Sequence, residues 1–97
     1  MKISGGFDWD QGNQHKNELK HGVANIECEE VFFHEPIIIA RDQRHSENEE
    51  RYTALGKTNA KRLLFVAFTI RQGHVRVISA RPMSRQEREL YEKEIEN

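Results

Sequence analysis

Several features that define whole classes of protein are missing from this 97-residue sequence. No apolar run approaches the roughly 20 residues that a membrane-spanning helix needs, and the opening stretch, MKISGGFDWD, lacks the apolar region of a secretion signal. Cys28 is the only cysteine, which excludes an internal disulfide and a thiolate cluster for zinc, and the five histidines have no paired ligand spacing. We therefore expect a cytoplasmic protein that does not enter a membrane and uses neither a metal ion nor another cofactor.

The length of the chain also excludes a second hydrophobic core, because two cores would each be too small to outweigh the loss of chain entropy. Hydrophobic residues make up 36% of the sequence and charged residues 32%, a balance typical of a folded globular protein. Residues 1–97 are therefore predicted to form a single domain.

Acidic residues are missing from one long stretch of the chain. Residues 51–85 contain 8 basic residues and no acidic one, which gives this stretch a formal charge of +8. Residues 1–50 have 5 basic and 11 acidic residues (−6), residues 86–97 have 2 and 5 (−3), and the three stretches add up to the overall −1. If the basic residues share a face, they attract a polyanion such as RNA. Alternatively, the acidic segments fold against the basic one and cancel its charge, and the sequence leaves both interpretations open.

The N-terminal third is predicted to hold a strand and two helices. We expect a short strand over residues 3–9, followed by a helix over residues 11–21 with Asp10 as its N-cap. Gly22 is expected to end this helix, because cationic residues precede it in the last turn. A second amphipathic helix is predicted over residues 25–33, where apolar residues recur at helical spacing.

The rest of the chain is predicted to form strands and one helix. Apolar and β-branched runs indicate strands over residues 37–40, 51–56, 62–71 and 74–81, the last two joined as a hairpin by Gln72 and Gly73. The run over residues 62–71 is apolar on both faces and is expected in the middle of the sheet.

A capping box formed by Ser84 and Glu87 begins the C-terminal helix. Its inner side is predicted to carry Leu90, Tyr91 and Ile95, and a Glu89–Lys93 pair is expected on its surface. The order of elements indicates an α+β domain with a mostly antiparallel meander sheet.

The stretch HVRVISAR, residues 74–81, contains two arginines with no acidic residue close to them in the sequence. Arginine forks onto phosphate oxygens, so Arg51, Arg76 and Arg81 are candidates for a phosphate clamp. Each is also explained as a solvated residue on a half-exposed strand. In a regular strand Arg76 and Arg81 point to opposite faces, so they share one face only if the strand bulges or ends between them.

Other residues are candidates for proton transfer or stacking. His21 is a candidate acid or base, because an imidazole can accept or give a proton at neutral pH, although its place at a helix end is equally explained by capping. Glu50 is a second candidate base or, alternatively, one half of a loop salt bridge. His45 and His74 are expected at the surface. A further hypothesis is that Phe7, Trp9 and Tyr52 form a surface on which RNA bases stack. For Phe7 and Trp9, packing in the core is the favoured interpretation.

Four motifs, in order along the chain, resemble the BrnT family of bacterial toxins. They are FDWD at residues 7–10, LKHGV at 19–23, HSENEERYTALGKT at 45–58 and RVISARPMSRQERELYE at 76–92. The resemblance implies a RelE-like fold and the toxin of a type II toxin–antitoxin system, which cleaves RNA and so inhibits translation and growth. It also implies a ribbon-helix-helix antitoxin as partner, through which alone operator DNA is contacted. The positions that it carries over are Lys20, His21, Arg51, Arg76 and Arg81.

The resulting hypothesis is a metal-independent endoribonuclease in which the ribose 2′-OH attacks the adjacent phosphate. His21 or Glu50 accepts the proton, the arginines stabilise the charge on the phosphorane, and Lys20 is a second clamp or protonates the leaving oxygen. The alternative is a non-catalytic module whose basic face binds an antitoxin or nucleic acid.

Overall fold

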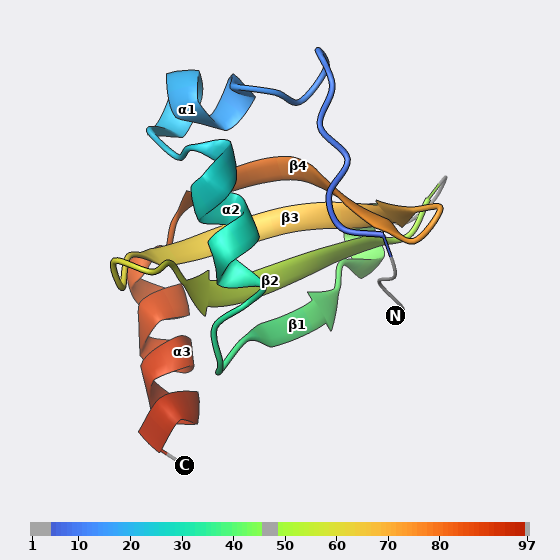
Figure 1. Cartoon of the computed structure of the whole chain (residues 1–97). Coiled ribbons are helices and arrows are strands. Elements are labelled where there is room, and N and C mark those ends of the chain that lie inside the picture. Colours follow the sequence, from blue (N-terminus) through green and yellow to red (C-terminus); the bar gives the residue numbers. More distant parts are fainter. Residues whose placement is uncertain (1–4, 46–48, 97) are drawn as a thin grey trace.

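The computed structural model describes residues 5–45 and 49–96 (Figure 1). In chain order the elements are α1 (Lys16–His21), α2 (Asn25–Val31), β1 (Ile38–Arg41), the short 3-10 helix η1 (Gln43–His45), β2 (Arg51–Lys57), β3 (Leu63–Arg71), β4 (His74–Pro82) and α3 (Arg85–Glu96). The strands form one antiparallel sheet in the order β1-β2-β3-β4. The predicted α+β class, the meander and the C-terminal helix are confirmed, whereas the likeness to the RelE fold stays a prediction.

The predicted N-terminal strand is wrong in extent. Its first residues, 3 and 4, lie outside the described part of the chain, and the rest forms a single parallel bridge between Phe7 and Val75. The Val75 N–H donates to the Gly6 carbonyl at 2.7 Å, and the Asp8 N–H donates to the Val75 carbonyl at 2.8 Å. The positive φ of Gly6, 84°, interrupts the extended backbone. This segment therefore lies along the free edge of β4 without becoming a regular strand.

The predicted first helix is wrong at its start and right at its end. The Asp10 carboxylate accepts a hydrogen bond from the Gly12 N–H at 2.8 Å, so Asp10 begins a turn instead of capping a helix. His15 has a left-handed φ of 62°, which separates this turn from α1. Gly22 ends α1 as predicted, with a φ of 67° and its N–H donating to the Glu18 carbonyl at 3.0 Å.

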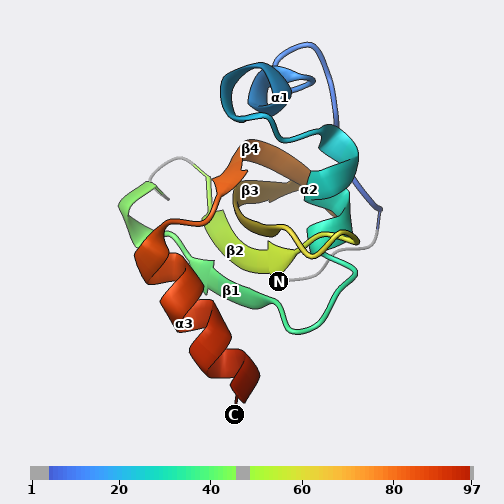
Figure 2. The same ribbon diagram turned by 90° about the vertical axis from the view of Figure 1, so that its left-hand side faces the viewer.

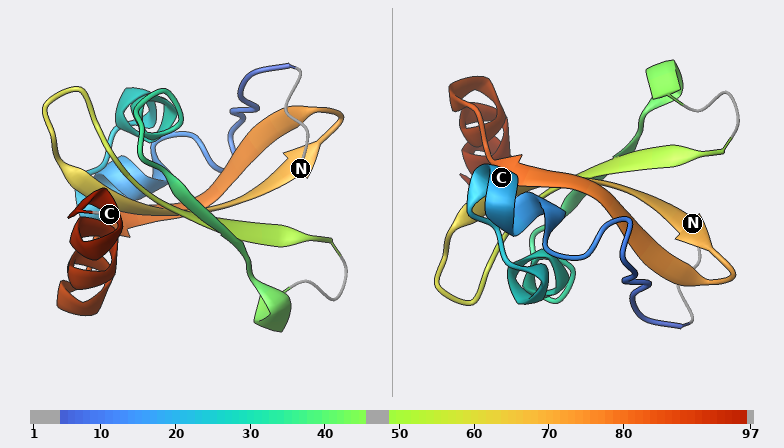
Figure 3. Two further views of the ribbon diagram at one scale, coloured as in Figure 1. Left: turned by 90° about the horizontal axis from the view of Figure 1, so that it is seen from below. Right: turned by 90° about the horizontal axis from the view of Figure 1, so that it is seen from above.

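The sheet has a covered face and an open face. Residues of even number on β3, such as Val66 and Phe68, point to the covered face and pack with Cys28 and Val31 of α2. Residues of odd number on β3 point to the other face, where α3 covers one end only. Figure 3 shows α2 and α3 on opposite sides of the sheet, and Figure 2 shows α1 beside the edge strand β4. The central place of β3 is confirmed. Of its open-face residues, Thr69 is buried and Arg71 is exposed, and the others, Leu63, Phe65 and Ala67, are partly covered.

Helix α3 is held at its start and in its middle. The predicted capping box is present, because the Ser84 N–H donates to Glu87 Oε1 at 2.8 Å and the Glu87 N–H donates to Ser84 Oγ at 3.2 Å. Tyr91 is fully buried, and its hydroxyl donates to the Pro36 carbonyl at 2.6 Å. The prediction that Leu90 and Ile95 also lie on the inner side is wrong, since their side chains are 51% and 49% exposed.

The surface of α3 has a different ion pair from the predicted one, since Glu89 accepts a hydrogen bond from Arg85 at 3.3 Å. In the part of the chain that the structure describes, no helix has the length and apolar character required to cross a bilayer.

Candidate functional site

A β-bulge in β4 decides where the two arginines of HVRVISAR point. Ser79 pairs with Ala67 and Val77 pairs with Phe68, so Ile78 is an extra residue between them. As a result Arg76 pairs with Thr69 and Arg81 pairs with Phe65, two positions on the same face of β3. Both arginines therefore lie on the open face, which is the outcome expected if the strand bulges between them. They are four β3 residues apart, which is about 13 Å along the strand.

The expectation that Arg76 has no acidic partner is wrong. Its two terminal nitrogens donate to the two carboxylate oxygens of Asp10 at 2.9 and 3.0 Å, and Asp8 Oδ2 lies 3.6 Å from Nη1. The pairing arises because the segment along the edge of β4 brings both aspartates to the open face. The hydrogen bond from Arg76 lowers the pKa of the Asp10 carboxyl, and the same hydrogen bond raises the pKa of Arg76.

Arg81 also has an acidic partner, contrary to expectation. It donates to the two carboxylate oxygens of Glu87 at 2.8 and 3.0 Å, and its guanidinium carbon lies 4.1 Å from the centre of the Phe65 ring. The hydrogen bond between them lowers the pKa of Glu87 and raises that of Arg81. Since Glu87 also belongs to the capping box, Arg81 connects β4 to the start of α3.

The acidic flanks fold against the basic stretch more widely. Arg62 pairs with Glu27 at 3.1 Å, and Arg71 pairs with Glu49 at 3.5 Å. Together with the pairs of Arg76 and Arg81, these contacts show that acidic residues from the flanking segments neutralise much of the positive charge of residues 51–85.

One small cleft on the open face gathers several cations. It has a volume of about 150 Å³, lies beside the bulge, and its polar lining includes Gly12, Asn13, Lys16, Glu49, Thr69, Arg71 and Arg76. Lys16 Nζ donates to the carbonyl of the bulged residue Ile78 at 3.3 Å. Sequence reasoning selected Arg76 but missed Lys16 and Arg71, which come from α1 and the end of β3.

Buried Asn13 fixes the loop that forms one wall of this cleft. Its side-chain amide donates to the carbonyls of Asp8 at 3.0 Å and Val77 at 3.2 Å, and its Oδ1 accepts from the Asp10 N–H at 2.8 Å. These bonds hold the two aspartates next to β4. An Asp-x-x-Asn spacing before a short helix is the only local signal for this loop, and it does not identify the distant acceptor.

The other predicted site residues lie at different distances from the cleft. Arg51 pairs with Thr69 across β2 and β3, so Arg51, Thr69 and Arg76 form one row across the open face. Glu50 accepts a hydrogen bond from the Tyr52 hydroxyl at 2.8 Å and lies 3.5 Å from Arg41. Since Tyr52 stacks on Phe68 at the covered face, the Glu50 carboxylate is directed away from the row.

Lys20 and His21 lie at the far end of α1. This helix runs beside residues 78–80 of β4, and the Gly22 carbonyl accepts a hydrogen bond from Arg62 at 2.8 Å. The contact with Arg62 puts the end of α1 near the start of β3, at the opposite end of the sheet from Arg76. The structure therefore does not bring Lys20 or His21 into the cleft.

The aromatic residues considered for stacking are engaged in packing. Phe7 lies edge-on to Phe32 with ring centres 5.5 Å apart, and Trp9 Nε1 donates to Glu29 at 2.8 Å. Core packing is confirmed for Phe7 and Trp9, which lie against the main core cluster.

Within residues 5–45 and 49–96, no group of three or more His, Cys, Asp or Glu side chains is placed to hold a metal ion. Burial raises the pKa of the Cys28 thiol to about 12.

Comparison with known families gives one match. Residues 9–87, which are 79 of the 97 residues, match the family described as the ribonuclease toxin, BrnT, of type II toxin-antitoxin systems. No protein with a curated description matches the chain. The matched range includes all the polar residues that line the cleft and both partners of the Arg81–Glu87 pair.

Proposed function

The chain belongs to the BrnT family of ribonuclease toxins of type II toxin–antitoxin systems, and we propose that it cleaves RNA in the cleft beside the β4 bulge. A toxin of such a system has a cognate antitoxin. The observation that carries the proposal is the convergence of Lys16, Arg71 and Arg76 on one cleft that also contains the carboxylate of Glu49.

The cations form a clamp for the scissile phosphate. Arg76 is 15% exposed and holds its fork in a fixed direction, whereas its partner Asp10 is 54% exposed. A phosphate has the same arrangement of anionic oxygens as a carboxylate, so RNA replaces Asp10 on the guanidinium. Arg51, in the same row across the sheet, extends the clamp.

The reaction begins with attack of the ribose 2′-oxygen on the adjacent phosphorus. Glu49 accepts the 2′-OH proton, because its carboxylate lines the cleft and lies 3.5 Å from Arg71. The arginines stabilise the negative charge of the phosphorane, and Lys16 protonates the 5′-oxygen as its bond to phosphorus breaks. The products are a 2′,3′-cyclic phosphate and a 5′-OH. Protein cations supply the charge stabilisation in this scheme, so it is metal-independent.

The remaining predicted residues have secondary roles in this proposal. Lys20, His21 and Arg81 contact the RNA strand where it leaves the cleft, and Glu50 is the alternative proton acceptor. We also propose that the antitoxin is a ribbon-helix-helix protein that alone contacts operator DNA, and that the toxin acts in the cytoplasm, with the sequence resemblance as support. A single domain over residues 1–97 is proposed on the basis of the short length of the chain.

The test is an RNA cleavage assay with the purified chain in the presence of EDTA. Arg71→Ala and Lys16→Ala are each expected to lower the rate by about 10²–10³-fold, the usual effect of removing one transition-state donor. Arg85→Ala is the matched control. This arginine is 87% exposed on α3, so the variant is expected to cleave RNA at the wild-type rate.

Each outcome of this assay is informative. Cleavage that EDTA abolishes would contradict the metal-free mechanism. Equal losses of cleavage rate in all three variants would contradict the assignment of the reaction to the cleft. Intact RNA with the wild-type chain would leave the second candidate, a non-catalytic binding module. The carboxylates already bound to Arg76 and Arg81 favour that candidate, since they neutralise the basic face.

A further inference from the structure

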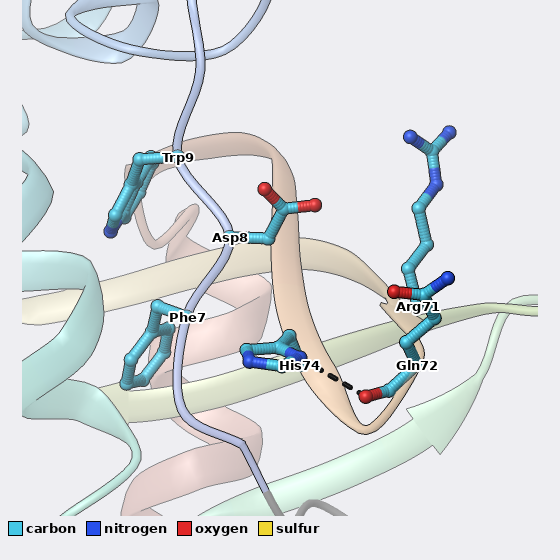
Figure 4. A pocket seen from close by; sticks show the side chains of 6 residues that line it. All are labelled: Phe7, Asp8, Trp9, Arg71, Gln72 and His74. Carbon is cyan, nitrogen blue, oxygen red and sulfur yellow. Dashed lines mark hydrogen bonds between the residues drawn. The ribbon is translucent and has the colours of Figure 1, made fainter.

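A larger cavity adjoins the cleft at the edge of β4. It has a volume of about 670 Å³, within the usual range of small-molecule sites, and is lined by Phe7, Asp8, Trp9, Arg71, Gln72 and His74 (Figure 4). Arg71 lines both this cavity and the cleft. We propose that the cavity binds a guanine base of the RNA, next to the phosphate held in the cleft, an inference that rests on the proposed function.

The polar groups of the cavity lie on two sides of it. In Figure 4 the Asp8 carboxylate and the Arg71 side chain lie on either side of the β4 ribbon, while the rings of Phe7 and Trp9 are directed to the opposite side of the N-terminal segment from Arg71. Asp8 Oδ2 lies 3.6 Å from Arg76 Nη1, so the carboxylate is next to the phosphate clamp. A nucleotide whose phosphate is on Arg76 therefore has its base within reach of Asp8.

The chemistry of these groups selects guanine. Guanine presents two adjacent N–H donors on its Watson–Crick edge, which match the two oxygens of a carboxylate, and acceptors O6 and N7 on the other edge. A guanidinium has five N–H donors, so Arg71 donates to these acceptors from one side and to the phosphate in the cleft from another. Adenine and cytosine present one amino group beside an acceptor, and uracil presents one N–H between two carbonyls. Asp8 and Arg71 together thus complement guanine better than any other base.

His74 gives the cavity a rigid wall. Its Nδ1–H donates to the Gln72 carbonyl at 3.0 Å, and a Cβ added at Gly5 would collide with its ring. The ring is therefore fixed by the tight β3–β4 turn on one side and by Gly5 on the other. A fixed aromatic ring next to the polar groups restricts the positions that a base can adopt.

The inference is tested by mapping the cleavage sites on RNA oligonucleotides that differ only in the nucleotide beside the scissile phosphate. The wild type is expected to cleave next to guanine at least tenfold faster than next to the other bases. Asp8→Asn is expected to reduce this ratio to near one, because an amide presents only one acceptor. Glu89→Gln, on exposed α3, is the control that keeps the ratio. The ratio is the measured quantity, since Asp8 also touches Arg76 and its loss changes the overall rate.

A binding measurement separates the two proposals. By NMR titration, guanosine 3′-monophosphate is expected to bind at least tenfold more tightly than uridine 3′-monophosphate or inorganic phosphate, with shifts at His74 and Gln72. Cleavage without base preference overturns the guanine site and leaves the proposed function intact. If the wild type does not cleave, the proposed function fails, and the titration alone decides: equal affinities overturn the guanine site and a tenfold preference supports it.

Discussion

Glutamine at position 87 should weaken the attachment of helix α3 to the sheet. Glu87 accepts two hydrogen bonds from Arg81 at 2.8 and 3.0 Å and a third from the Ser84 N–H at 2.8 Å. The Glu87 side chain is 22% exposed and that of Arg81 is 35% exposed, so solvent screens the pair only in part. Glu87→Gln keeps the shape of the side chain and removes its charge.

The expected loss follows from two contributions. A solvent-exposed ion pair is worth about 0.2–1 kcal/mol, and the two-pronged, partly buried geometry puts this one near the upper end. Glutamine still accepts a hydrogen bond from the Ser84 N–H, so the capping box is kept, but the loss of a negative charge in the first turn of α3 costs about a further 0.3–1 kcal/mol. We therefore expect a loss of about 1.3–2 kcal/mol in the free energy of unfolding, which lowers the Tm of a chain of this size by roughly 5–16 °C.

The loss should depend on pH in a defined direction. The folded state lowers the pKa of Glu87, so this group stabilises the fold above its ordinary pKa and loses that contribution as the pH falls through the lowered value. Arg81 stays charged throughout this window, because its pKa is raised. The difference in Tm between the wild type and Glu87→Gln should thus be largest near neutral pH and should disappear in acid.

Thermal unfolding followed by circular dichroism at several pH values measures this difference, and Arg81→Met completes a double-mutant cycle that isolates the pair. An unchanged Tm at pH 7, or a gap that persists in acid, would refute the reasoning. The same variants test the role of Arg81 in the reaction. A direct contact with RNA predicts that Arg81→Met lowers the cleavage rate at least tenfold more than Glu87→Gln does.

Three further predictions concern buried residues and the packing around them. Gly56→Ala puts a Cβ 2.7 Å from Val31 Cγ1, so urea unfolding should show a loss of about 1–3 kcal/mol that Val31→Ala partly restores in the double variant. Asn17→Ala removes the acceptor 3.0 Å from the Ala80 N–H and should cost about 1–3 kcal/mol, with faster hydrogen exchange at that amide; unchanged exchange would contradict this. Cys28 should resist thiol reagents at pH 8 until urea unfolds the chain, because it is buried and its pKa is about 12, and rapid labelling of the folded chain would show otherwise.

The elements that the sequence predicted well are those whose signals are local. Gln72 and Gly73 form the tight hairpin turn with φ values of 52° and 80°, and the capping box at the start of α3 lies within four consecutive residues. The first helix was predicted too long because its polar residues fit a helix and a turn equally well. The choice depends on Asn13, whose amide reaches the Val77 carbonyl 64 residues later, and no local pattern contains that contact.

The candidate site was predictable only in part for the same reason. The shortage of acids near HVRVISAR drew attention to Arg76, but its true partner, Asp10, is 66 residues away in the chain. Alternation showed that the strand had to bulge or end between the two arginines for them to share a face, although it did not say which of the two would occur or at which residue. Lys16 and Arg71 look like ordinary surface cations in the sequence, and only the folded sheet brings them together.

The bulge at Ile78 acts as a phase shift in the alternation of β4. Up to Val77 one set of side chains faces the core, and after the extra residue the opposite parity does, as buried Ala80 shows. Removing one residue here would return β4 to regular alternation and leave only one of the two arginines on the open face. The length of this strand is therefore constrained as strictly as its composition, so a change that preserves every charge but shortens β4 by one residue would still divide the basic surface between the two faces of the sheet.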